Sequence, residues 1–187
     1  MNLLKVTLGV TALLAVAKIG YDNLPLHTQH ELSDWYKSLG TPTFTESPDY
    51  FAPRAQEEII AENRARGHEL ECYGNLGPAE RISASNDYLC SAHIRSAYDN
   101  IPARLVTFFF GNGKLQNVRI EFAAHSFPKL ENYLSRKLAD YPRIDNRYGT
   151  DSFGKPLVVW RVKDGQITAS AEETAGQNPI ILWTAYR

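Results

Sequence analysis

The chain has 187 residues, of which 43% are hydrophobic, and its 20 basic and 21 acidic side chains give a formal net charge of −1. This length suits one domain with a short extension, because most domains contain about 100–150 residues. A nearly neutral chain without a local basic stripe lacks the positive surface that nucleic-acid binding requires. We therefore expect a globular protein with enough apolar side chains for a core and no nucleic-acid partner.

The first 20 residues form a hydrophobic N-terminal segment. Lys5 precedes an uncharged, mostly apolar run over residues 6–17, and Ala15-Val16-Ala17 has the small-x-small spacing of signal cleavage sites. The run is shorter than the ~20 apolar residues that cross a bilayer, and Lys18 is unfavourable directly after a cleavage site. A cleaved signal peptide and an uncleaved membrane anchor stay open, whereas apolar side chains all around the segment disfavour a buried cytosolic helix. Both open interpretations predict a periplasmic or secreted protein, with membrane contact only through residues 1–20 if these are not cleaved.

Cys72 and Cys90 are the two cysteines of the chain. An even number of cysteines in an exported protein predicts a disulfide, and closing this loop should stabilise the fold by about 3 kcal/mol. A buried pair of thiols is the first alternative. The second is a cysteine nucleophile, for which His68 and His93 are close in sequence although no family signature surrounds either.

Residues 21–67 are expected to form a helical N-terminal extension. Thr28-Gln29-His30-Glu31 has the spacing of a capping box, which predicts a helix over 29–39. A second helix is predicted over 53–66, with Gly67 in the position after its end where glycine is favoured.

From His68 onward the apolar residues alternate with a period of two, which is typical of strands. The helix that follows Ser126 carries an apolar stripe and stops before Pro142. The segment between Pro142 and Pro156 is polar and is expected to be a loop. The predicted strands cover residues 68–73, 88–98, 103–110, 114–123, 157–163, 166–172 and 180–186.

These elements predict an α+β fold for residues 68–187. We expect an antiparallel sheet of about six or seven strands with one main helix packed on a face. A hydrophobic N-terminal helix and two short helices precede it. The clearest local signal is the turn Gly111-Asn112-Gly113, because Asn-Gly is the preferred pair in tight hairpins.

Several core and turn positions between Cys72 and Tyr186 form a pattern: the two spaced cysteines, the hairpin Phe109–Leu115, the helix from Phe127 to Leu138 and the hairpin from Trp160 to Ile167. In these features the chain resembles a loose group of small, uncharacterised periplasmic proteins of proteobacteria. The resemblance implies a disulfide-linked antiparallel sheet with one packing helix, and a periplasmic location. It carries over no catalytic residue.

The long segment Tyr141–Pro156 is the candidate partner-binding site. Arginine and tyrosine are enriched where proteins grip partners, and long loops in compact domains are often functional. The alternative is that its aromatic side chains pin the loop to the core. The candidate residues are Tyr141, Arg143, Arg147, Tyr148, Asp151 and Phe153.

No serine-hydrolase, phosphate-loop or metalloprotease motif occurs in the sequence. His27 and His30, three residues apart and beside Glu31, could supply metal ligands, but they are better interpreted as solvated surface histidines. We therefore assign no catalytic residue, metal or cofactor. The sequence favours an exported, non-enzymatic envelope protein that binds another protein as an inhibitor, an immunity protein or an accessory subunit of an envelope assembly. One alternative is a small periplasmic hydrolase, for which a cleft with His93, Arg95 and an acid would argue. The other is a lipid or small-ligand carrier with a cavity along Leu105–Phe110.

Overall fold

The computed structural model describes residues 18–151 and 154–186. The side chains of His27, His30, Glu31, Asp34, Asn146, Arg147 and Tyr148 also lie outside the description. The chain divides into two compact units, Met1–Tyr36 and Lys37–Arg187. Most of the predicted leader, residues 1–17, is not described, and no helix among the described residues is long and apolar enough to cross a membrane.

Helix α2 (Leu26–Ser38) confirms the helix predicted over residues 29–39 and begins earlier than expected. The carbonyl oxygen of Pro25 accepts hydrogen bonds from the backbone N–H groups of Thr28 (2.9 Å) and Gln29 (3.1 Å), which closes the first turn. Gly40 follows the helix with a φ of 81°, a conformation that favours glycine.

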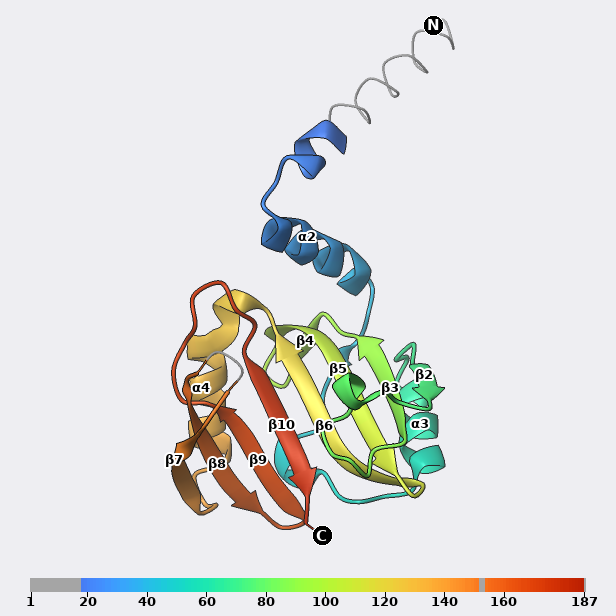
Figure 1. Cartoon of the computed structure of the whole chain (residues 1–187), viewed down its shortest axis with the longest axis vertical. Helices are drawn as coiled ribbons and strands as arrows, with labels where there is room; N and C mark the ends of the chain where they lie inside the picture. The colour runs from blue at the N-terminus through green and yellow to red at the C-terminus, as the bar shows by residue number, and fades with distance from the viewer. Residues whose placement is uncertain (1–17, 152–153, 187) are drawn as a thin grey trace, which may run out of the picture. The chain divides into compact units, whose positions relative to one another are not determined.

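The second unit has the predicted α+β class (Figure 1). Its helical elements are η1 (Pro48–Tyr50), α3 (Gln56–Ala65), η2 (Pro78–Glu80), η3 (Ala124–Ser126) and α4 (Phe127–Lys137). Its strands are β1 (Thr43–Phe44), β2 (Glu71–Gly74), β3 (Tyr88–His93), β4 (Ser96–Ala97), β5 (Ile101–Gly111), β6 (Lys114–Phe122), β7 (Arg143–Thr150), β8 (Pro156–Val162), β9 (Gly165–Ser170) and β10 (Ile180–Ala185).

Among the described residues these ten strands form one mixed, mostly antiparallel sheet in the order β1-β4-β5-β6-β10-β9-β8-β7, with β3 paired to β5 and β2 paired to β3. The sheet therefore has more strands than the six or seven expected, and it is not wholly antiparallel. The pair β1–β4 is parallel and the other neighbours are antiparallel. Strand β10 therefore sits near the middle of the sheet, although it comes last in the chain.

The β5–β6 hairpin forms as the sequence predicts. Gly111 pairs with Lys114 across the turn. The two residues between them, Asn112 and Gly113, have φ values of 53° and 70°. Asparagine and glycine are the residues that tolerate this left-handed backbone, so the local sequence sets the register of the two central strands.

The strand predicted over residues 88–98 is interrupted, so that β3 and β4 lie against different parts of β5. The register of β5 shifts between Ala103 and Leu105, and the backbone N–H of Ile94 bonds to the carbonyl of Arg104 at 3.1 Å instead of continuing the regular ladder. A β-bulge of this kind bends the strands around it. The bend directs Arg95 toward β1, where its Nε lies 3.5 Å from the Thr43 hydroxyl.

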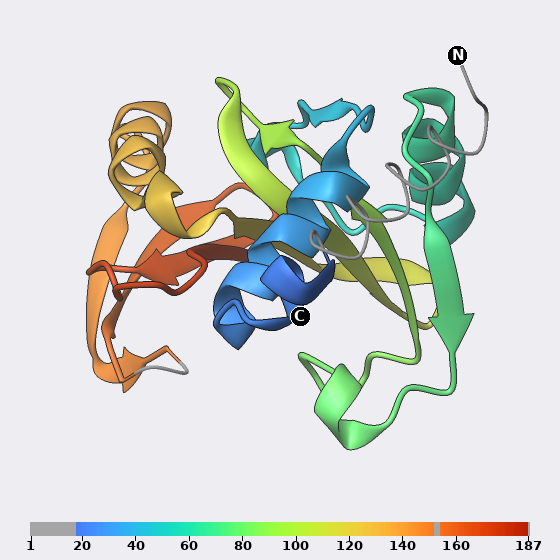
Figure 2. The same cartoon turned by 90° about the horizontal axis from the view of Figure 1, so that it is seen from above.

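Helices α3 and α4 cover the same face of the sheet (Figure 2). Alternate side chains of the central strands meet them in one core, and Trp183 of β10 and Phe108 of β5 are among its most buried members. The principal core residues are Phe44, Phe51, Ile59, Val106, Phe108, Phe110, Val118, Ile120, Phe122, Leu130, Leu134, Leu138, Trp160, Ile167, Ile181 and Trp183.

The segment before His68 contributes to this core. Phe44, Phe51 and Ile59 are at most 2% exposed. Phe51 packs edge-on against Trp183, with ring centroids 5.8 Å apart. Residues 43–65 therefore complete the main domain, a role that the expectation of a helical extension over 21–67 did not include.

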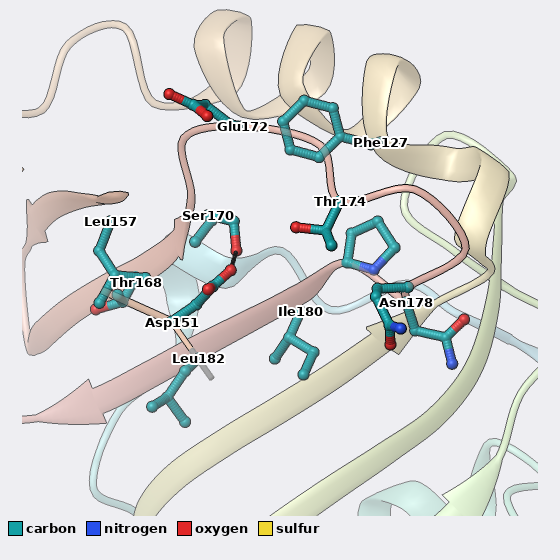
Figure 3. A pocket seen from close by; sticks show the side chains of 13 residues that line it. Phe127, Asp151, Leu157, Thr168, Ser170, Glu172, Thr174, Asn178, Ile180 and Leu182 are labelled. Carbon is teal, nitrogen blue, oxygen red and sulfur yellow. Dashed lines mark hydrogen bonds between the residues drawn. The ribbon is translucent and has the colours of Figure 1, made fainter. Parts of the chain in front are cut away.

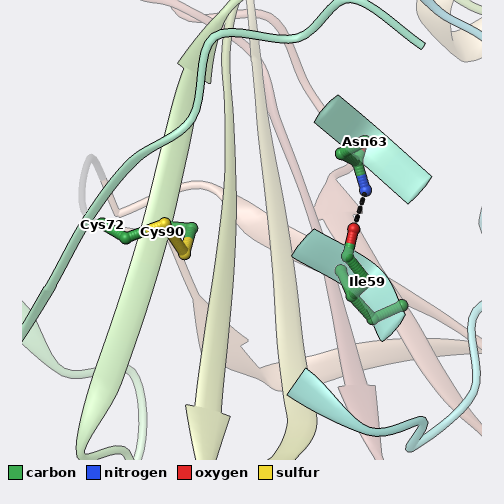
Figure 4. Close-up of a disulfide and its surroundings, with 4 residues drawn as sticks. All are labelled: Ile59, Asn63, Cys72 and Cys90. Carbon is green, nitrogen blue, oxygen red and sulfur yellow. Dashed lines mark hydrogen bonds between the residues drawn. A yellow bond between two sulfur atoms is a disulfide. The ribbon is translucent and has the colours of Figure 1, made fainter. Parts of the chain in front are cut away.

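Cys72 and Cys90 form a disulfide, as predicted. The two residues face each other across β2 and β3 on the side of the sheet that α3 covers, near Ile59 and Asn63 (Figure 4). Cys90 is fully buried. The bridge ties the short edge strand β2 to the sheet, so β2 does not rely on its few ladder hydrogen bonds alone.

Strand β7 occupies the segment that was expected to be a polar loop. It pairs with β8 from Arg143↔Trp160 to Asn146↔Leu157, then shifts register before Thr150↔Pro156. The expectation of a loop over 142–156 is corrected here. Its sequence lacks apolar alternation because β7 is the last strand of the sheet and contributes little to the core.

Candidate functional site

The face of the sheet opposite the two helices carries the hollows in which a ligand or partner could bind. The strand register shows which residues share this face. Leu182 of β10 pairs with Thr168 of β9, which pairs with Val159 of β8. These side chains point away from the core, because their neighbours Ile181, Trp183 and Ala169 are buried on the helix side. This face is the candidate functional surface.

A groove lies on this face over β8, β9 and β10, and we call it the β10 groove (Figure 3). Its volume is about 210 Å³. Leu157, Ile180 and Leu182 give it an apolar floor, and Phe127 from the start of α4 closes one end. The remaining lining residues are Asp151, Thr168, Ala169, Ser170, Glu172, Thr174, Gln177, Asn178 and Pro179.

Asp151 fixes one wall of the β10 groove. One of its carboxylate oxygens accepts a hydrogen bond from the Ser170 hydroxyl, which Figure 3 shows as a dashed line. The other accepts the backbone N–H of Lys155 at 2.9 Å. The tip of the β7–β8 hairpin is thereby joined to β9, so this wall is formed before any partner arrives.

The loop between β9 and β10 forms the opposite wall. Glu172 at its start pairs with Lys155 at 3.2 Å, and the backbone N–H of Gln177 bonds to the carbonyl of Thr174 at 3.0 Å. The hydroxyl of Thr174 is buried and has no hydrogen-bond partner among the described residues. The groove therefore combines an apolar floor with a hydrogen-bonding rim that includes the carboxylates of Asp151 and Glu172.

The β10 groove has no set of groups suited to catalysis. Its ionisable lining residues are Asp151 and Glu172, and both already have partners. No lining residue is a histidine, a cysteine or a lysine. Its arrangement suits the capture of an apolar side chain.

A second hollow, of about 340 Å³, lies over β2 and β3 and contains His93 with Ser91, Glu69 and Glu71. Among the described residues, no hydrogen bond joins Ser91 or His93 to each other or to either glutamate, and the buried Nδ1 of His93 has no partner. Arg95, which the hydrolase alternative requires in a cleft with His93, lies near Thr43 of β1. No three His, Cys, Asp or Glu residues in the described part of the chain are grouped to hold a metal ion.

The apolar strand β5 is covered on both sides near its end, at residues 108–110, whereas Leu105 is partly exposed and lines the hollow over β2 and β3. Phe108 lies in the core under the helices, while Phe109 is buried with Leu76 and Leu89 beneath the loop that contains η2. Phe109, Leu76 and Leu89 line neither the β10 groove nor the hollow over β2 and β3.

The predicted partner-binding residues do not form one cluster. Tyr141 is half-buried before β7, and its hydroxyl lies 3.4 Å from the Asp49 carboxylate. Arg143 at the start of β7 stacks over the Trp160 ring at 5.6 Å. Asp151 lies beyond the far end of the strand, where it lines the β10 groove. The side chains of Arg147 and Tyr148 and all of Phe153 lie outside the described residues.

Sequence reasoning did not single out Leu157, Ile180 and Leu182, which make the floor of the groove. Their alternation marked strands, but alternation alone does not show whether an apolar side chain faces the core or the open side. The loop of residues 171–179, with its cluster of polar residues and Gly176, was the available signal that this part of the sheet has a rim.

Comparison with known proteins gives no match: no family model, curated protein or solved structure is significantly similar to the chain. The function is therefore argued from the geometry of the site.

Proposed function

We propose that this protein is an exported, non-enzymatic envelope protein that binds another protein through the β10 groove. The groove itself is the observation that supports the proposal. Its volume of about 210 Å³ is below the range of about 300–1,000 Å³ typical of small-molecule sites. A hollow of this size accepts one or two apolar side chains, which is how a partner anchors itself at a binding hot spot.

The rigidity of the groove supports the same proposal. Asp151 and Glu172 hold the two walls through Ser170 and Lys155, so binding an apolar side chain requires little reorganisation. Preformed pockets bind more tightly because less conformational entropy is lost on association.

Export is proposed from two features of the chain. The N-terminal 20 residues have the composition of a signal peptide or an anchor. The disulfide between Cys72 and Cys90 suits an oxidising compartment. Within the envelope, an inhibitor, an immunity protein or an accessory subunit of an assembly would each act by such a contact.

A pair of matched substitutions tests the proposal. Leu182→Glu places a charge in the floor of the groove, and Ile144→Glu places one on the same face of the sheet, outside the groove. Ile144 is 42% exposed and Leu182 is only partly buried, so neither change removes a core side chain. We expect the Ile144 variant to retain the partner that co-purifies from envelope extracts and the Leu182 variant to lose it.

Thermal unfolding followed by circular dichroism checks that both variants fold. The proposal fails if no protein co-purifies with the unmodified chain, or if the folded Leu182 variant retains the same partner at the same yield.

A further inference from the structure

A separate pocket with a mixed polar and apolar lining is found where three segments meet: the β5–β6 turn, the end of β10 and residues 82–86. Its volume is about 440 Å³. We call it the amide pocket, because amide and hydroxyl side chains line it beside apolar ones. The lining residues are Pro53, Ile82, Ser83, Ser85, Gly111, Asn112, Lys114, Leu115, Gln116, Asn117, Thr184, Ala185 and Tyr186.

A hydrogen-bond network holds the polar groups of the amide pocket in place. Asn117 is 1% exposed, accepts a hydrogen bond from the buried Asn86 amide at 3.2 Å and donates one to the Thr184 hydroxyl at 3.0 Å. Gln116 accepts from Ser85 at 2.6 Å and from Asn86 at 3.1 Å. Gln116 and Asn117 are therefore held by hydrogen bonds to side chains of the same network, and this is the support that a preorganised binding site requires.

Gly111 permits the close packing that builds this network. A Cβ atom at this position would clash with the Gln116 amide and with the backbone carbonyl of Ser85. The glycine therefore lets residues 83–86 lie directly against the hairpin, which closes one side of the pocket.

The chemistry of the lining narrows the class of ligand. No aspartate or glutamate lines the pocket, which leaves no carboxylate ligand for a metal ion or partner for a cation. Lys114 is the single cation in the lining, short of the clustered positive charge that holds a phosphate. The amide and hydroxyl side chains in the lining disfavour a lipid chain, because covering them with an apolar group removes them from water and offers no new hydrogen bond. The amide and hydroxyl side chains of the lining both donate and accept hydrogen bonds, and the hydroxyl groups of a sugar do the same.

Two exposed apolar side chains in the lining, Tyr186 and Ile82, complete this match. Tyr186 is 49% exposed and Ile82 is 40% exposed, although both are large hydrophobic residues. A sugar ring has one face of C–H groups that stacks on an aromatic ring, while its edge presents hydroxyl groups. Hydrogen-bonding groups beside an exposed tyrosine supply both contacts.

We infer that the amide pocket is a binding site for a neutral saccharide. Tyr186 stacks on a sugar ring, and Gln116, Asn112 and the two serines bond to its hydroxyl groups. The pocket adjoins the β10 groove, since Leu182 and Thr184 lie on the same face of β10 and each lines one of the two. The inference does not depend on the proposed protein partner, because different residues carry it.

The test is a titration of the isotopically labelled full chain with maltotriose and, separately, with tri-N-acetylchitotriose, followed by amide NMR. We expect at least one of the two saccharides to shift the signals of Ser83, Asn112, Gln116 and Thr184. Tyr186→Ala should weaken this binding about tenfold, and Tyr186→Phe, which keeps the ring, should retain it.

Tyr73→Ala is the matched control, because Tyr73 is 48% exposed on β2 and does not line the pocket. This variant, and Leu182→Glu in the groove, should bind the saccharide as the unmodified chain does. The inference is overturned if neither saccharide shifts the pocket signals at millimolar concentration, or if Tyr186→Ala binds as tightly as Tyr73→Ala. In either case the network serves only to hold residues 83–86 on the sheet.

Discussion

The rings of Tyr98 and Tyr133 stack almost parallel, with centroids 4.6 Å apart and 4° between their planes. Tyr133 belongs to α4, and Tyr98 lies in the turn between β4 and β5 with a φ of 54°. A left-handed backbone is unfavourable for a bulky side chain, so the packing around Tyr98 must stabilise it. The stack fixes this helix to the end of the sheet.

The hydroxyl of Tyr98 is buried without a hydrogen-bond partner among the described residues, and burial raises its pKa well above the ordinary value. Tyr98→Phe removes the unpaired group and keeps the ring, so we expect the free energy of unfolding to stay unchanged or to rise by about 1 kcal/mol. Tyr98→Ala also removes the stack and should lower it by about 3–5 kcal/mol. Urea denaturation measures both changes, and a clear loss in the phenylalanine variant would show that the hydroxyl is bonded in solution.

His68 should make the protein less stable in mild acid. It is 3% exposed, its ring lies 5.8 Å from that of Phe44, and burial, with a smaller contribution from Arg66, lowers its pKa below 6.5. The unfolded chain therefore takes up a proton below pH 6.5 that the folded chain resists, so the free energy of unfolding falls as the pH falls through this range.

Chemical denaturation of the unmodified chain and of His68→Gln between neutral pH and pH 5 measures this dependence. The variant lacks the titrating group and should show a smaller loss. Burial raises the pKa of Glu46, so its protonation makes the free energy of unfolding rise as the pH falls, which is opposite to the effect of His68. Both proteins contain Glu46, so the difference between them removes its contribution. Identical slopes would contradict the assignment to His68.

The disulfide should contribute substantially to stability. The bridge joins residues separated by 18 positions, and a loop of this length corresponds to about 3 kcal/mol. The double substitution of Cys72 and Cys90 by alanine should lower the free energy of unfolding by about this amount, and the unmodified chain in excess reductant should match the variant. A loss below about 1 kcal/mol would mean that β2 is held mainly by its other contacts.

Gly165 at the start of β9 has no room for a side chain. A Cβ atom there would clash with the backbone carbonyl of Thr184 and the indole of Trp183. Gly165→Ala should therefore cost about 1–3 kcal/mol by overpacking. Gly77→Ala, where the nearest atom is the flexible Glu80 carboxylate at 3.3 Å, should change stability by less than about 0.5 kcal/mol. Equal melting temperatures for the two variants would contradict this packing.

Local chemistry determined which parts of the fold the sequence could predict. The turn at Asn112 and Gly113 and the glycine at position 67, with a φ of 86°, depend on backbone conformations that few residues adopt. The apolar stripe of α4 has the helical period, and its observed span, Phe127–Lys137, confirms the predicted helix. Such signals need no knowledge of distant contacts.

The features that were missed depend on contacts between distant parts of the chain. Strand β7 has a polar sequence and exists because β8 offers it an edge. Phe44 and Phe51 lie in short segments without a period, so nothing in their neighbourhood shows that Phe51 packs on Trp183 or that Phe44 packs on Phe108. The candidate site depends on the same kind of information, since Asp151 meets Ser170 only after β7, β8 and β9 have paired.

The most direct test of the central claim is site-specific photo-cross-linking in intact cells, with the photoreactive amino acid placed at position 182 or at position 144. Both positions lie on the open face of the sheet, but only position 182 lines the β10 groove. The account predicts a discrete covalent adduct with one envelope protein from position 182 and none from position 144. The absence of an adduct at 182, or the same adduct from both positions, would contradict it.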